Sequence, residues 1–381
     1  MRDAIFFTGW TWNAFNTPER VALAMAHLGA KVLYCENPTS LFRDRQPAEL
    51  REVSENVYVT RPRHWGHRLN YFPPLRKAQT KALAKQFRRL ASTLGLSDPI
   101  FFYCNLSGLK PLCEEMKKNF FSVYLRLDYL ESDSDYFVEV SDATLAIPRS
   151  VFHKLKAKFG EKVKLIPQAV DLRVLRQSSA SRAEGASRLE CVPRPRLGYL
   201  GSPNVGRLNQ EVLSTLLQAH PDWHMVSIGT KAVPLSNAHA LAWVGPQELA
   251  GYLYGFDIGF LPYDCHDEQW LHCVPLKLFE YFALGMPVVS TPLINLWEYE
   301  DLIYFGDTAE ELAAAVESAL NEPLDSPKRQ KRLDVARNHS IESLSRSLLQ
   351  ALPLDVQENA PSLAAPVLCA SSNFCSGAEI L

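Results

Sequence analysis

Short apolar runs alternate with amphipathic stretches of helical period along most of the chain. The first run, Ile5–Phe7, predicts a strand, and a helix is predicted over Thr17–Leu28, with Thr17 as its cap and Gly29 as its stop. Further strands are predicted at 31–34, 99–103, 121–124, 143–146 and 164–166. Because these strands are apolar almost throughout, they predict a parallel sheet covered by helices on both faces.

Small polar residues interrupt this pattern between 178 and 195, and residues 181–195 are predicted to form a linker. The alternation then restarts with strands at 196–201, 224–228, 258–261 and 288–289. The chain is therefore predicted to form two doubly wound α/β domains, 1–180 and 196–335, that face a central cleft where ligands bind. A C-terminal helix is predicted within 336–352, and the aperiodic tail 353–381 is predicted to be disordered.

Composition narrows the class of protein. The chain has 381 residues, a net charge of −2 and 47% hydrophobic residues, which is typical of a soluble two-domain protein without affinity for nucleic acid. No apolar run approaches the roughly 20 residues that span a bilayer, and the apolar start is too short for a signal peptide. The eight cysteines show no zinc-site spacing, so we expect reduced thiols, a cytoplasmic location and no metal.

The segment Val274–Thr291 carries the strongest chemical signal. Pro275 is predicted to take the first position of a helix that Gly285 ends. The free N–H groups around Pro275 and Leu276 would face an anion, and Lys277 adds a positive charge in the first turn. Glu280 lies three residues later on the same side, where a carboxylate can accept hydrogen bonds from two neighbouring hydroxyls, as on a ribose. An ordinary surface ion pair is the alternative interpretation.

Several segments, in this order and spacing, resemble the GT-B glycosyltransferases of group 1, a retaining family that uses sugar nucleotides. They are Trp10–Pro38, Leu165–Leu175, Arg196–Leu208, Trp243–Tyr263 and Val274–Thr291. The resemblance covers about residues 1–352. It implies an enzyme of hexosyltransferase type in polysaccharide biosynthesis, with a nucleotide-diphosphate sugar as donor and a glycan or polyprenyl-phosphate-linked acceptor. No cofactor or metal is implied.

The resemblance also implies roles for particular residues. Glu280 would hold the ribose hydroxyls, and Lys277 and Arg207 would stabilise the charge of the departing diphosphate. Gly201 would let the backbone approach a phosphate, and Val244 with Gly245 would contact the base. The implied donor-binding residues are Gly201, Val244, Gly245, His272, Pro275, Leu276 and Glu280, with Arg207 and Lys277 as the catalytic cations.

One position departs from the family pattern. Many relatives have a glutamate eight residues before the ribose glutamate, and this chain has His272 there. His272 either contacts a sugar hydroxyl or is a loop histidine without a role.

The acceptor is expected on the N-terminal domain. Trp12 and Asn13 follow the first strand, where the ring either stacks on a sugar or packs against the next helix. Asn105 and Asp128 are further acceptor-binding candidates. The Asp133–Asp135 segment imitates a metal-binding motif and is interpreted as a solvated acidic loop.

Residues 61–89 are basic, and no acidic residue occurs between Glu55 and Asp98. Lys77, Lys81 and Lys85 recur at helical spacing, which suits an anionic membrane surface; a solvated helix face is the alternative. The protein would then be peripheral at the inner face of the membrane.

Two other functions remain open at this point. One is a non-catalytic scaffold that binds a nucleotide or a glycan. The other is a nucleotide-sugar epimerase, which needs acidic and histidine residues around the sugar that the sequence does not reveal. Fold alone does not separate these functions.

Overall fold

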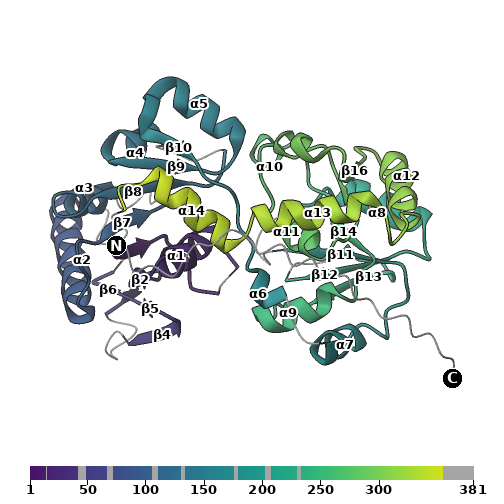
Figure 1. The fold of residues 1–381 in the computed structure, drawn as a ribbon, viewed down its shortest axis with the longest axis horizontal. Coiled ribbons are helices and arrows are strands. Elements are labelled where there is room, and N and C mark those ends of the chain that lie inside the picture. The colour runs from purple at the N-terminus through teal and green to yellow at the C-terminus, as the bar shows by residue number, and fades with distance from the viewer. Residues whose placement is uncertain are drawn as a thin grey trace, which may run out of the picture.

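The computed structural model describes residues 1–13, 15–41, 49–66, 72–104, 110–129, 134–175, 179–201, 207–229 and 233–354. Figure 1 shows two lobes, each built on its own sheet. Asn105, Asp133 and most of the predicted tail fall outside the described residues.

The N-terminal sheet has eight strands in the order β10-β9-β8-β7-β1-β2-β5-β4, and only β4 runs antiparallel to its neighbour. The strands are β10 (Val163–Leu165), β9 (Ala143–Ala146), β8 (Ser122–Arg126), β7 (Ile100–Tyr103), β1 (Ala4–Phe7), β2 (Val32–Cys35), β5 (Val57–Thr60) and β4 (Leu50–Ser54). The predicted parallel sheet is confirmed. Strands β4 and β5 were not predicted: β4 is mostly polar and has no buried residue, and β5 is only four residues long.

Both faces of this sheet are covered, as the apolar strands require. Ala4 and Phe6 of β1 belong to one core, while Ile5 and Phe7 belong to another, because successive side chains point to opposite faces. The first core is closed by α1 (Thr17–His27) and α14 (Ile341–Ala351). The second is closed by α2 (Pro73–Leu94), α3 (Lys110–Lys117), α4 (Ser134–Val140) and α5 (Arg149–Phe159).

The C-terminal sheet has six parallel strands in the order β13-β12-β11-β14-β15-β16. They are β13 (Ala238–Leu241), β12 (His224–Ile228), β11 (Arg196–Leu200), β14 (Ile258–Leu261), β15 (Val288–Ser290) and β16 (Ile303–Phe305). The helices are α8 (Gln210–Ala219), α9 (Pro246–Leu253), α10 (Glu268–Leu271), α11 (Leu276–Ala283), α12 (Ala309–Leu320) and α13 (Pro327–Asn338). The predicted fold, two Rossmann-like domains, is confirmed.

Each sheet reverses its strand order beside its first strand, at β1/β7 in one and β11/β14 in the other. Loops diverge at the carboxyl ends of such strands and leave a crevice that binds ligands. The loop after β1 and the segment after β11 therefore begin at the two places where the fold favours a site.

The predicted linker at 181–195 is wrong in its first part, because α7 (Ser179–Ser187) is a helix that packs on α9. A Cβ added at Gly185 would lie 2.1 Å from the Cα of Gly251, so the two helices need glycines where they touch. The small residues that suggested a loop serve this close approach instead.

The C-terminal helix begins at Ile341, and α14 lies on the N-terminal lobe beside α1 (Figure 1). Leu344 and Leu348 enter the core under the N-terminal sheet, and Ser345 Oγ donates a hydrogen bond to Ala24 O. The chain thus returns to its first half after completing the second. No helix among the described residues has both the length and the apolar character needed to span a bilayer.

Candidate functional site

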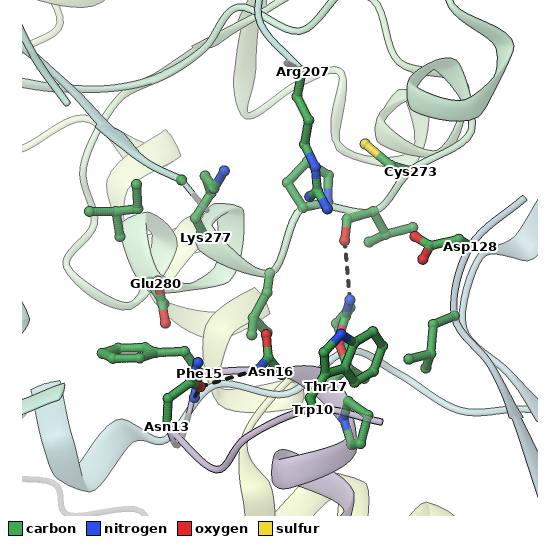
Figure 2. A pocket seen from close by; sticks show the side chains of 18 of the residues that line it. Trp10, Asn13, Phe15, Asn16, Thr17, Asp128, Arg207, Cys273, Lys277 and Glu280 are labelled. Atoms are coloured by element: carbon green, nitrogen blue, oxygen red, sulfur yellow. Dashed lines mark hydrogen bonds between the residues drawn. The ribbon is translucent and has the colours of Figure 1, made fainter. Parts of the chain in front are cut away.

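A cavity of about 470 Å³ lies between the two lobes. It is lined by the loop after β1, the start of α1, the ends of β11 and β13, and the start of α11. The lining residues are Trp10, Asn13, Phe15, Asn16, Thr17, Pro18, Leu127, Asp128, Gln168, Leu200, Gly201, Arg207, Trp243, Leu249, Tyr263, Cys273, Val274, Pro275, Leu276, Lys277 and Glu280. Figure 2 shows Arg207 and Lys277 on one wall and Asn13, Phe15 and Asn16 on the opposite wall.

The C-terminal wall holds two cations. The Arg207 guanidinium lies 4.6 Å from the ring centre of Trp270, and its buried Nε has no hydrogen-bond partner among the described residues. Lys277 Nζ donates to Tyr263 Oη at 3.0 Å and lies 4.0 Å from the ring centre of Tyr199. An acceptor-rich anion would satisfy both groups.

The proton affinity of Lys277 is reduced by its surroundings. Burial, and then the nearby charge of Arg207, lower the pKa of the ammonium to about 7. An anion placed between the two cations would offset both effects, because its charge stabilises the ammonium and reduces the repulsion from Arg207. The wall is therefore short of negative charge.

Helix α11 supplies this lysine and the carboxylate beside it. Gly285, with φ of 67°, follows its C-terminal end, as predicted, whereas Pro275 is its N-cap and lies one residue before the first helical position that was predicted for it. Burial raises the pKa of Glu280, against the opposing charges of Arg20 and Lys277. Glu280 is 6% exposed and lines the cavity, so the interpretation of Lys277 and Glu280 as a surface ion pair does not hold.

Gly201 directly follows β11 and lines the cavity. A Cβ at this position would lie 2.3 Å from the Tyr199 ring, so a side chain cannot be added without moving that ring. Of the donor-binding set, the structure brings Gly201, Pro275, Leu276 and Glu280 to the cavity together with both predicted cations.

Val244 and Gly245 do not line the cavity, although they directly follow Trp243, which does. The Trp243 ring meets the Phe15 ring edge-on, with centres 5.0 Å apart, so it closes the cavity across the two lobes. Trp243 and Phe15 both lie in segments that carry the family resemblance, but no role was predicted for either ring, because their meeting depends on how the two lobes pack.

His272 does not line the cavity. Its ring stacks on Tyr129 at 3.7 Å between centres, and Nδ1 lies 3.1 Å from Ser150 Oγ. Asn295 Nδ2 donates to both Ser150 Oγ and the carbonyl oxygen of His272. His272 therefore joins the two lobes, and the predicted contact with the donor sugar is not supported by its place.

Some of the predicted acceptor-binding residues line the cavity and others do not. Asn13 and Asp128 line the cavity. Trp12 instead packs edge-on against Tyr34, with ring centres 5.0 Å apart, and its backbone N–H donates to Glu36. Packing is therefore the interpretation that the structure supports for Trp12. Asn105 lies outside the described residues.

Glu19 organises the loop that carries Asn13. Its carboxylate accepts hydrogen bonds from the backbone N–H groups of Asn13 and Asn16, both at 3.1 Å. Asn16, not Thr17, is the N-cap of α1. The Thr17 hydroxyl instead donates to Gln168, whose amide donates to the carbonyl oxygen of Val274 across the lobes.

Among the described residues, one group of side chains has the spacing of metal ligands. Atoms of Cys265, His266 and Asp307 lie within 4.8 Å of one another, and none of the three lines the cavity. Burial raises the pKa of Cys265 to about 12, and its Sγ donates to Asp307.

Two facing Rossmann-like domains with a cavity between them, cationic on one wall, define a GT-B glycosyltransferase architecture. The family model of glycosyl transferases group 1 matches residues 194–322. A protein of Bacillus subtilis (strain 168) named "Putative teichuronic acid biosynthesis glycosyltransferase TuaH" is 25% identical over 291 residues, 68% of each chain. The predicted resemblance is confirmed, and the protein is an enzyme of the glycosyltransferase class.

Solved structures share the fold. Sucrose-phosphate synthase from Thermosynechococcus elongatus superposes with a TM-score of 0.66 at 14% identity, covering 92% of this chain and 98% of its own. HepE from Anabaena, in complex with UDP and glucose, gives a TM-score of 0.61 at 13% identity over 92% and 99% of the two chains.

The reduced pKa of Lys277 predicts how anion binding depends on pH. A bound diphosphate favours the charged ammonium, so binding takes up a proton above the free pKa of about 7. We compare the Kd of the wild type for inorganic pyrophosphate with the Kd of the Lys277→Arg variant. Above pH 7 the ratio of the wild-type Kd to the variant Kd should rise by up to about tenfold per pH unit, because arginine stays charged.

Isothermal titration calorimetry from pH 6 to 9 measures both constants. The arginine variant cancels the titration of pyrophosphate itself. A ratio of the two constants that stays flat with pH would show that Lys277 does not bind the anion.

Proposed function

We propose that this protein transfers a sugar from a nucleoside-diphosphate sugar to a glycan or a lipid-linked acceptor, without a metal ion and with retention of configuration. The observation that carries the proposal is the meeting of Arg207, Lys277 and Glu280 at one cavity. Two cations suit a diphosphate, and a carboxylate one helical turn away suits the two hydroxyls of a ribose.

Departure of the diphosphate is the step that these cations assist. Negative charge develops on the leaving oxygen as the sugar–oxygen bond breaks, and fixed positive charges in a partly buried site stabilise it. Arg207 is held against Trp270, and Lys277 lies between Tyr199 and Tyr263, so neither cation needs to reorganise during the reaction.

The N-terminal wall is the proposed acceptor side. Trp10, 39% exposed, offers a ring on which a sugar can stack, and Asn13 and Asp128 offer polar groups. TuaH is named for teichuronic acid biosynthesis, which supports a polysaccharide acceptor for this chain too. Uridine nucleotides are the first donors to test, because HepE was solved with UDP.

A panel of nucleotide sugars tests the function. We expect at least one to raise the Tm of the purified protein and to release its nucleoside diphosphate when membrane extract supplies the acceptor. Glu280→Ala is expected to weaken nucleotide binding by about 10–100-fold, the loss typical of hydrogen bonds to a charged group, with the fold unchanged by circular dichroism.

The outcomes separate the candidate functions. No stabilisation by any nucleotide contradicts both the transferase and the epimerase. Binding without turnover favours the non-catalytic scaffold, and interconversion of nucleotide sugars without an acceptor favours the epimerase.

We also propose that the protein is cytoplasmic and peripheral at the inner face of the membrane. Lys77, Lys81 and Lys85 are exposed along α2, while Leu83 and Phe87 are buried in the core. Phe72 and Leu75, 59% and 42% exposed, begin the same helix and would enter the lipid interface. Arg68 and Tyr71 of this basic segment lie outside the described residues.

Liposome sedimentation tests this surface. We expect binding to vesicles with anionic lipid that weakens with salt and is lost in the variant with all three lysines changed to Glu, since each contributes about 1 kcal/mol near the surface. The matched control changes Arg329, Lys331 and Arg337 of α13 to Glu. Equal, salt-insensitive binding to neutral and anionic vesicles would count against the proposal.

A further inference from the structure

The carboxylate of Glu280 is paired with a residue from the other lobe. Arg20, on α1, places Nη2 at 3.5 Å from Glu280 Oε1, and the two side chains are only 4% and 8% exposed. The pair is therefore a buried bridge between the N-terminal lobe and the donor side of the cavity.

Arg20 lies between two carboxylates. The charge of Arg20 also acts on Asp171, which forms its own pair with Arg173. Arg20, Asp171 and Glu280 line one small void beside the main cavity. The buried Nε of Arg20 has no partner among the described residues, so the guanidinium is not fully satisfied by the chain.

A buried carboxylate without a partner would take up a proton. Burial raises the pKa of Glu280, and Arg20 is the largest influence that lowers it, ahead of Lys277. A protonated carboxyl would offer one donor and fewer acceptor sites, so it would hold two ribose hydroxyls less well.

We propose that Arg20 is a positioning residue that holds Glu280 ionised and oriented for the nucleotide. The inference rests on the proposed function. Its consequence is that the donor site is complete only when the N-terminal lobe is docked, because one lobe carries the ribose carboxylate and the other carries its counter-ion.

The plain alternative is an ion pair that only holds the lobes together. Arg149 and Glu298 make such a bridge, with Nε and Oε2 2.7 Å apart and side chains 56% and 31% exposed, and neither residue lines the cavity. Arg149→Met is therefore the matched control for Arg20→Met.

The experiment measures the Kd for the nucleoside diphosphate that binds the wild type most tightly, by calorimetry between pH 6 and 9. We expect Arg20→Met to weaken binding by about 10–100-fold at pH 7, the range for a lost charged interaction. The ratio of its Kd to that of the wild type should shrink as pH rises and ionises Glu280 again. Arg20→Lys should restore most of the affinity, and Arg149→Met should stay within about twofold of the wild type.

Other titratable groups near Glu280 also influence the pH dependence of nucleotide binding. Lys277, on the same helix, and Tyr281, next in sequence, also interact with it, while Asp171 acts on Arg20. Taking the ratio to the wild type cancels the titration of Lys277 that both proteins share.

A double variant covers the case in which Arg20→Met fails to fold. Arg20→Met with Glu280→Gln removes both charges and leaves neither buried alone. If Arg20 acts through Glu280, the double variant binds about as well as Glu280→Gln alone. A further loss as large as that of Arg20→Met in the wild type, or a ratio independent of pH, would overturn the role of Arg20. If the wild type binds no nucleotide, the proposed function fails. If the wild type binds a nucleotide and Arg20→Met binds it equally well, only the role of Arg20 fails, so the two failures are distinguishable.

Discussion

Two charged groups buried one turn apart on α11 set the requirements for the rest of the site. Glu280 is buried and Lys277 is half-buried at the cavity, and each needs electrostatic compensation that its own helix does not provide. Tyr263 and the rings around it accommodate the lysine, and Arg20 reaches from the other lobe to the glutamate. Arg207 and Lys277 together leave an excess of positive charge at the cavity. This excess is the physical basis for binding a diphosphate.

The two lobes are held together by contacts that surround the cavity. His272 stacks on Tyr129, Gln168 bridges Thr17 and Val274, and the start of α14 runs beside the segment after β10 through the pairing of Val170 with Ser340. Of these residues, Thr17, Gln168 and Val274 also line the cavity, so part of the contact between the lobes is part of the site. A ligand that binds more tightly when the lobes are docked would also stabilise the docked arrangement, because the two effects are thermodynamically linked.

Local pattern was sufficient for the apolar strands at the centre of each sheet and for the helix that carries Lys277 and Glu280, but not for strands such as β4 and β5. The apolar strands predicted both parallel sheets, and Pro275, Lys277, Glu280 and Gly285 predicted the helix that carries the charges. The prediction was wrong where a partner distant in sequence decides the structure. Small residues near Gly185 lie in a helix that packs closely on α9, where a Cβ at Gly185 would meet the backbone of Gly251. His272 stands at a family donor position, yet the ring of Tyr129 in the other lobe determines where it lies.

The central claim is that one cavity holds a nucleoside diphosphate across α11. A crystal structure with the tightest-binding nucleoside diphosphate tests it most directly. We expect the ribose hydroxyls within hydrogen-bond distance of Glu280, and the diphosphate oxygens at Arg207 and Lys277. A nucleotide bound outside this cavity, or bound in it with the ribose away from Glu280, would contradict the account.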